Sequence, residues 1–145
     1  MKVKYTYINS IFPSPTTMET FVLNPSFGGF SLSDEALRLL KWHKHARYLV
    51  LETDVRSNRE LVRVCKKLGA RASEDGKSFK FVDVASSDVP FVKLSEYDGM
   101  ESLTIDTNAK ASATYAKAID AARAVLACGN LSADEKVSLI TTILK

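Results

Sequence analysis

The sequence is poor in the features that mark secreted and membrane proteins. It has only two cysteines, Cys65 and Cys128, each on the apolar stripe of an expected helix. We therefore expect both thiols to be buried rather than joined in a disulfide framework. No apolar run approaches the length of a membrane span, and the first ten residues lack the apolar core of a signal peptide. These absences favour a cytoplasmic protein without membrane contact.

Signatures of catalysis are also missing. There is no G-x-S-x-G nucleophile motif and no Walker or Rossmann glycine pattern. His43 and His45 do not have the spacing of zinc ligands on a helix, and neither cysteine is near them in the sequence. We therefore expect no catalytic residue, no bound metal and no cofactor. The missing signatures favour a protein that is not an enzyme, but they do not decide whether it has an enzymatic activity.

What is present fits one small globular domain with an appendage. The chain has 145 residues, of which 46% are apolar and 26% charged, and its net charge is +3. This length can bury a core without disulfides or metals. Apolar periodicity predicts strands at 3–8, 19–23, 47–53 and 78–85, and helices at 33–44 and 58–68. We predict an α+β fold with a mostly antiparallel or mixed sheet and two packed helices.

Capping residues set the expected helix starts. The helix at 33–44 can begin from a Ser31–Asp34 capping box or from Ser33 alone. The helix at 58–68 can begin from a box formed by Ser57 and Glu60, and Gly69 follows it. A glycine at that place is typical of the left-handed position that ends a helix.

A glycine-rich segment precedes the first helix. It runs from Phe27 to Phe30 with Gly28 and Gly29 between the two rings. We expect a turn with both aromatic side chains in the core. The alternative is an anion held by backbone amides at the helix start.

The composition changes after Thr107, where alanine becomes dominant. Residues 108–128 are predicted to form a helix with one apolar stripe made of Tyr115, Ile119, Ala122 and Leu126. Gly129 ends it, and a capping box of Ser132 and Glu135 opens a final helix. We therefore expect an α+β domain at 1–106 and an Ala-rich helical hairpin at 107–145.

Asp98-Gly99 lies between two alternating runs, which predicts a two-residue β-hairpin. In this register Glu96 faces Glu101 at the turn end of an apolar face formed by Val92, Leu94, Leu103 and Ile105. Like charges directly opposite each other destabilise a sheet. Something in the structure must therefore offset their repulsion.

Three explanations of this carboxylate pair are open. Both groups can extend into water. Alternatively, Arg56 lies where the expected 47–53 strand enters the next helix and bridges the two as a clamp. In the third explanation the pair joins Asp98 to bind a divalent cation or to do acid–base chemistry. The candidate carboxylate cluster is therefore Arg56, Glu96, Asp98 and Glu101.

A candidate basic patch lies at the end of the first expected helix. It consists of Arg38, Lys41, Trp42, Lys44, His45 and Arg47. Basic residues interleaved with aromatic rings can bind phosphates and stack on bases. The simpler interpretation is a solvated helix end whose cations complement the helix dipole. The patch belongs to a segment, 38–80, that carries twelve Lys/Arg against five Asp/Glu, so nucleic acid is one candidate partner.

Two runs resemble an uncharacterised family of small proteins from phages, large DNA viruses and some bacteria. They are R-S-N-R-E-L-V-R-V-C-K-K-L-G, from Arg56 to Gly69, and S-E-Y-D-G-M-E, from Ser95 to Glu101. Members share R-x-D-x-x-L-V-x-V-V-E-x-L-G and E-Y-D-G-x-E, and Asn58 stands here in place of the first Asp. The resemblance implies a compact domain in a viral setting, in the host cytoplasm or the virion. It also implies that the members of the candidate carboxylate cluster, Arg56 included, are parts of one sequence pattern.

Three functional hypotheses follow. The leading one is a non-enzymatic protein-interaction or structural accessory protein, viral in origin, that uses the helical hairpin at 107–145 to bind a protein partner or itself. The second is a nucleic-acid-binding accessory protein that uses the basic 38–80 face. The third is a carboxylate-dependent metal enzyme of unknown substrate, with Arg56 or Lys93 polarising that substrate.

Overall fold

The computed structural model describes residues 17–48 and 52–145, so the strand expected at 3–8 lies outside the described residues. The α+β class is confirmed, with five α-helices and two small antiparallel sheets in the described part of the chain. The strands are β1 (Met18–Leu23), β2 (Lys80–Ala85), β3 (Val92–Tyr97) and β4 (Met100–Ile105). The helices are α1 (Asp34–Leu40), α2 (Thr53–Arg56), α3 (Arg59–Leu68), α4 (Thr107–Ala127) and α5 (Ala133–Ile143), with short 3-10 turns at Lys44–Arg47, Gly69–Ala72 and Val89–Phe91.

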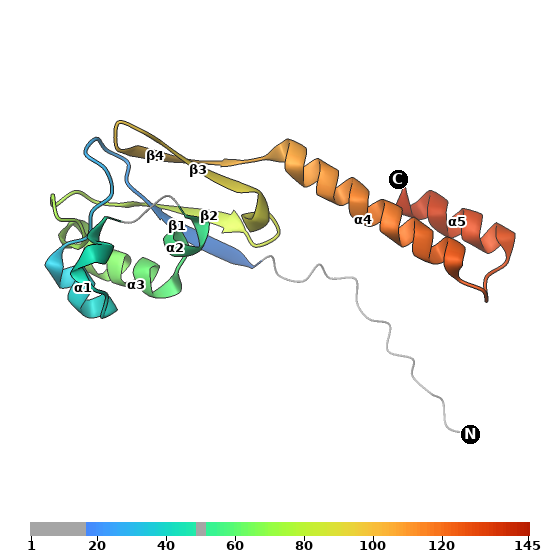
Figure 1. Ribbon diagram of the computed structural model, residues 1–145, viewed down its shortest axis with the longest axis horizontal. Helices are drawn as coiled ribbons and strands as arrows, with labels where there is room; N and C mark the ends of the chain where they lie inside the picture. The colour runs from blue at the N-terminus through green and yellow to red at the C-terminus, as the bar shows by residue number, and fades with distance from the viewer. Residues whose placement is uncertain (1–16, 49–51) are drawn as a thin grey trace, which may run out of the picture.

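The β1–β2 sheet separates two apolar clusters (Figure 1). The strands pair antiparallel, and successive residues of β1 point to opposite faces. On one face Val22 packs with residues of α1 and α3 such as Leu37, Leu61 and Val64. On the other face Phe21 and Val84 pack against Val92 and the apolar side of the β3–β4 hairpin. The hairpin and the helices therefore cover opposite faces of one small sheet.

The helices α1 and α3 each begin at a single capping side chain rather than at a capping box. Ser33 caps α1 and accepts a hydrogen bond from the Ala36 N–H, which selects the second of the two expected starts. Asn58 caps α3, accepting from the Glu60 and Leu61 N–H groups, so the expected box from Ser57 is wrong. An asparagine side chain caps as well as serine, and it stands one residue nearer the first turn.

The helix expected at 33–44 ends earlier, at Leu40. Lys41 adopts a left-handed conformation with φ 57°, and the Trp42 N–H returns to the Leu37 carbonyl at 3.0 Å. This pattern is a Schellman ending, in which the residue after the left-handed position packs on the helix. Trp42 does so against the core and is half-buried there. Tertiary packing of Trp42 therefore ends the helix without the glycine that usually occupies the left-handed position after a helix.

The strand expected at 47–53 is wrong wherever the structure describes it. Lys44–Arg47 is a 3-10 turn and Thr53–Arg56 is the helix α2, while residues 49–51 lie outside the described residues. Helical hydrogen bonds from the Arg56 N–H to Glu52 and from Ser57 to Thr53 close this turn. The turn directs the Arg56 side chain into the interior, a role that an apolar alternation pattern cannot signal.

The glycine-rich segment before α1 is a turn, as expected, but only one of its rings is buried. Phe30 stacks on Phe79 with centroids 4.4 Å apart, whereas Phe27 is 58% exposed. Gly28 and Gly29 both have positive φ, 101° and 81°, and turn the chain sharply between the rings. The two aromatic residues therefore leave the turn on different sides, and the expectation for Phe27 is corrected.

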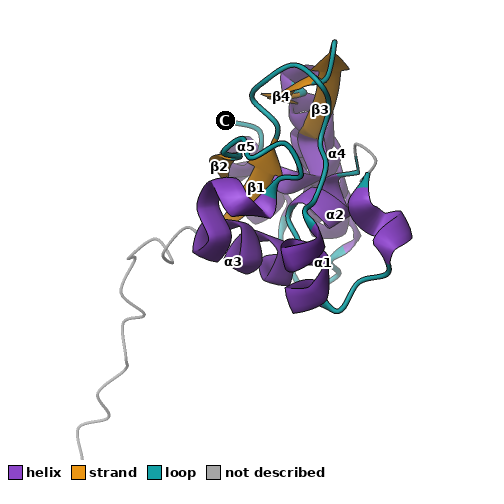
Figure 2. Cartoon of the chain, turned by 90° about the vertical axis from the view of Figure 1, so that its left-hand side faces the viewer, coloured by secondary structure: helices purple, strands orange, loops and turns teal. Residues whose placement is uncertain are grey.

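The helices α4 and α5 form a hairpin that extends away from the rest of the molecule (Figure 1). In Figure 2, which is viewed along this direction, the two helices lie behind the other elements. Asp106 caps α4, accepting from the Ala109 N–H at 2.9 Å, and pairs with Lys93 at 2.6 Å. Lys110 pairs with Asp88 at 2.5 Å, which fixes the first turn of α4 to the body. At the far end Ser132 and Glu135 form the expected capping box.

Neither hairpin helix contains a buried residue. Cys128, at the end of α4, is half-buried, so the expectation that both thiols are buried holds only for Cys65. The reason is that α4 lacks a body to pack against over most of its length (Figure 1). Across the described segments, no helix combines the length and the apolarity that crossing a membrane requires.

Candidate functional site

The expected β-hairpin register is confirmed, with Glu96 directly opposite Glu101. Arg56, the last residue of α2, pairs with Glu101 on β4. Its Nη1 lies 2.9 Å from Oε2 and its Nη2 lies 2.5 Å from Oε1. Both side chains are almost completely removed from solvent, with 0% and 2% exposure. Two parallel N–H···O bonds between unlike charges form the strongest common type of side-chain pair.

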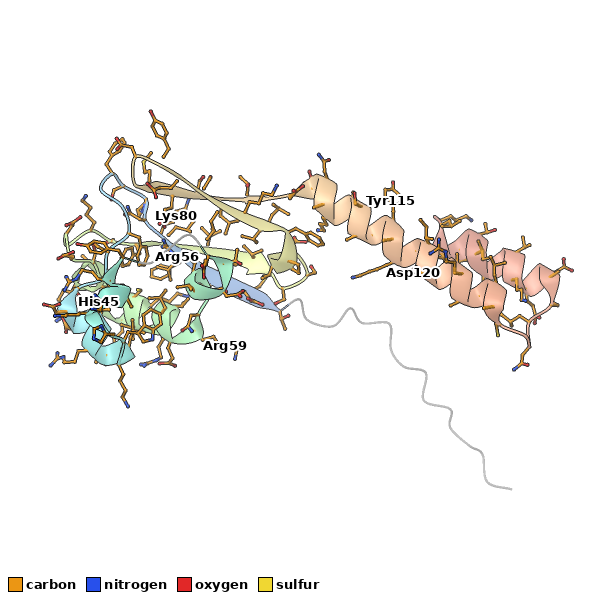
Figure 3. All side chains as sticks on the ribbon, viewed as in Figure 1. His45, Arg56, Arg59, Lys80, Tyr115 and Asp120 are labelled. Carbon is orange, nitrogen blue, oxygen red and sulfur yellow. The ribbon has the colours of Figure 1, made fainter. Side chains whose placement is uncertain are left out.

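Arg56 lies within the body of the molecule, away from the α4–α5 hairpin (Figure 3). The guanidinium carbon lies 3.9 Å from the centre of the Phe30 ring, and Nη1 is 3.4 Å from the Val22 carbonyl oxygen. Removal from water lowers the pKa of Arg56, and the charge of Glu101 opposes this shift. An arginine in such a place stays charged, so the site needs the partner carboxylate to offset its desolvation.

Glu101 also holds the chain after β1. Its Oε2 accepts from the Asn24 N–H at 2.8 Å, and its own N–H donates to the Asn24 carbonyl at 2.8 Å. The buried Asn24 side chain in turn donates to the carbonyls of Gly99 and Ser26. Sequence reasoning missed Asn24, although an Asn-Pro pair directly after a strand is a turn signal that could have directed attention to it.

The other two members of the expected cluster lie at the turn and are exposed. The Oε1 atom of Glu96 accepts from the Gly99 N–H at 2.9 Å, which closes the turn. Asp98 has φ 51°, and its carbonyl accepts from the Gly28 N–H at 3.4 Å. The structure therefore brings Arg56 and Glu101 together in the interior, whereas Glu96 and Asp98 lie exposed at the turn.

This geometry favours a structural clamp over a metal centre, but the expected bridge between the two carboxylates is wrong, because Arg56 pairs with Glu101 in the interior while Glu96 lies exposed at the turn. Both oxygens of Glu101 are engaged by Arg56, and Oε2 also accepts from the backbone. In residues 17–48 and 52–145 no group of three or more His, Cys, Asp or Glu side chains is arranged to hold a metal ion. Lys93, the other candidate for substrate polarisation, is paired with Asp106 instead. The arrangement therefore fixes the β3–β4 hairpin to the body.

The basic patch is only partly available to a partner. Arg38, Lys41, Lys44 and His45 are exposed around the end of α1, and His43 stacks on His45 at 4.6 Å. Arg47, however, pairs with Asp34 and, at 2.7 Å, with Glu74. Trp42 packs against the core and is not presented for base stacking.

Among the described residues, six of the twelve exposed large apolar side chains belong to the α4–α5 hairpin. Its helices meet along a seam of half-buried residues, which includes Ala118, Ala122 and Val125 on α4 and Lys136, Ile140 and Ile143 on α5. Tyr115, Ile119 and Leu126 are 71%, 47% and 59% exposed, and Val137 and Leu144 are 65% and 61% exposed. Figure 3 shows Tyr115 on the part of α4 that extends beyond the body.

These five side chains share one side of the hairpin. At about 100° per residue, Ile119 and Leu126 lie roughly 70–95° around α4 from the seam, and Val137 and Leu144 lie roughly as far around α5 in the same sense. Because the helices are antiparallel, equal rotations in the same sense bring both sets to the same side. We call Tyr115, Ile119, Leu126, Val137 and Leu144 the apolar face.

No protein-family model matches the chain, and neither any curated protein nor any solved structure is significantly similar to it. The function must therefore be inferred from the chain's own residues.

Proposed function

We propose that this chain is a non-enzymatic protein-interaction or structural accessory protein whose interface is the apolar face of the α4–α5 hairpin. One observation carries the proposal: five large apolar side chains lie together on a projecting element that buries no residue of its own. Exposed apolar groups of this kind are costly in water unless a partner covers them. The proposal includes a viral accessory role, in host cytoplasm or virion, which is supported by the family resemblance alone.

The attachment of the hairpin supports the same role. The Lys93–Asp106 and Lys110–Asp88 pairs fix the base of α4 to the β3–β4 hairpin and the turn before it. The Arg56–Glu101 pair then fixes the β3–β4 hairpin to the body. A series of contacts therefore runs from the core to the projecting helices, which is suited to presenting a surface rather than to enclosing a substrate.

Photocrosslinking tests the proposal. A benzophenone amino acid is placed at Tyr115, on the apolar face, and separately at Lys117, which lies about 200° around α4 from Tyr115. In cells that carry the gene we expect illumination to crosslink the chain at position 115 and not at position 117. No crosslinked product at either position, or equal products at both, contradicts an interface on the apolar face.

A further inference from the structure

The occupant of the apolar face can be inferred from its size and from the charges beside it. On α4 the outer edge carries Asp120 and Arg123, which are exposed and lie 3.5 Å apart as an i, i+3 pair. On the α5 side, Asp134 lies in the first turn of the helix near the tip, and Lys145 follows the end of the helix at the base; both residues are exposed. Each edge of the hairpin therefore presents one anion and one cation beside an apolar strip.

This arrangement of charge is self-complementary. If two hairpins pack face to face about a two-fold axis along the helices, the Asp120–Arg123 edge of one lies beside the Lys145–Asp134 edge of the other. From base to tip the order is anion, cation on α4 and cation, anion on α5, so unlike charges meet. If the axis runs across the helices, Asp120 lies beside Arg123 of the second copy. Matching a surface to itself is what a two-fold interface requires.

We propose that the apolar face binds a second copy of this chain, so that two α4–α5 hairpins form a four-helix bundle. This inference rests on the proposed function of the hairpin as an interface. The apolar faces of antiparallel helix pairs form the core of such bundles. The net charge of +3 is small, so two copies repel each other weakly.

The size of the face sets the expected strength. With 21 residues α4 is about 31 Å long, and with 11 residues α5 is about 16 Å long. At a helix width of about 10 Å the footprint is on the order of 500 Å² per copy, so the dimer buries on the order of 1,000 Å² in total. This lies near the lower limit for specific interfaces. The dimer should therefore be reversible and should dissociate on dilution.

Sedimentation velocity on the full chain, from the low to the high micromolar range, measures the self-association directly. We expect the mass to rise from one chain to two with concentration. The double variant Leu126→Gln/Val137→Gln removes two members of the apolar face and should weaken dimerisation at least about tenfold. Leu139→Gln is the matched control, because Leu139 is also exposed but lies on the opposite side of the hairpin. Far-ultraviolet circular dichroism checks that all variants keep their helices.

A chain that remains monomeric at every concentration, or a control that weakens the dimer as much as the double variant, overturns the inference. The two proposals fail separately. If the chain is monomeric but the crosslinker at position 115 captures a different protein, the interface remains and the second copy is wrong. If the chain is monomeric and position 115 captures nothing, both are wrong.

Discussion

Arg56 and Glu101 form a buried two-bond ion pair between α2 and β4, with Nη1–Oε2 at 2.9 Å and Nη2–Oε1 at 2.5 Å. The pair joins residues 45 positions apart in the chain. It places the turn end of the β3–β4 hairpin over the chain after β1, where Asn24 bonds to the same carboxylate. The repulsion expected between Glu96 and Glu101 is offset because one of the two is inside with a cation and the other is at the surface.

Glu101→Gln should strongly destabilise the fold. The substitution keeps the shape of the side chain but removes the negative charge that faces the buried Arg56 guanidinium, and breaking a buried ion pair in this way costs about 3–5 kcal/mol of unfolding free energy. Equilibrium urea denaturation measures this loss.

Glu96→Gln is the matched control for that experiment, since Glu96 lies opposite in the register but is exposed. It should cost only a fraction as much. Equal losses for the two variants would show that the clamp does not determine the stability of the hairpin. The double variant Arg56→Met/Glu101→Leu should regain part of the loss, because apolar side chains then replace both members of the buried ion pair.

Gly99→Ala should destabilise the protein through a backbone collision. A Cβ at position 99 would lie 2.1 Å from the Gly29 nitrogen and 2.6 Å from the Gly28 nitrogen. Gly76→Ala is the control, because Gly76 has a similar positive φ of 70° but open space around its Cβ position. Both substitutions carry the left-handed cost of about 1–2 kcal/mol. Thermal unfolding should show a clearly larger loss of stability for Gly99→Ala than for Gly76→Ala. Equal losses would mean that the turn at Gly99 does not contact the turn at Gly28 and Gly29.

Acid should loosen the start of α4. The hydrogen bond from the Ala109 N–H and the pairing with Lys93 lower the pKa of Asp106 from its ordinary value of 3.8. A depressed pKa in the folded state means that the stabilisation is complete above the ordinary value and is lost as the pH falls through the lowered one. We expect helical ellipticity to decline below about pH 4 in the wild type.

Asp106→Asn keeps a capping side chain but removes its titration. In this variant the part of the acid-induced decline that belongs to α4 should be absent. A pH profile identical to that of the wild type would assign the decline to other carboxylates.

The two thiols should differ in reactivity. Burial raises the pKa of Cys65 to about 12, with the nearby Arg56 charge opposing the shift, whereas Cys128 is half-buried at the end of α4. Because the thiolate is the reactive form, a thiol reagent at mildly alkaline pH should modify Cys128 first and Cys65 only on unfolding. Cys128→Ser should therefore abolish labelling of the native protein. Prompt labelling of that variant would indicate frequent opening of the core around α3.

Much of the local structure follows from short patterns. Asp98-Gly99 between alternating runs gave the correct hairpin register, and Ser132 with Glu135 gave the correct start of α5. These features succeed because turn and cap chemistry act over four residues. The strand predicted at 47–53 is wrong in the described residues. Apolar alternation does not signal a helical turn that directs the Arg56 side chain inward.

The candidate site shows the same division. The opposition of Glu96 and Glu101 follows from the period of a strand, and Arg56 was one of several partners that could resolve it. The approach of Gly99 to Gly28 and Gly29 had no counterpart in the sequence pattern. A contact between glycines far apart in the chain cannot be predicted from the spacing of apolar side chains, because glycine has no side chain to contribute to such a pattern.

The sequence by itself determined the elements whose stability is local: the hairpin turn, the capped helices and the Ala-rich pair after Thr107. Only the tertiary structure decided which carboxylate is buried, where α1 ends, and that Tyr115, Ile119 and Leu126 of the α4 stripe face outward while Ala122 lies in the seam with α5. The physical reason is that burial is a competition among all apolar surfaces for a limited interior. The β1–β2 sheet is already covered by α1 and α3 on one face and by β3–β4 on the other, which leaves no covered place for the stripe on α4.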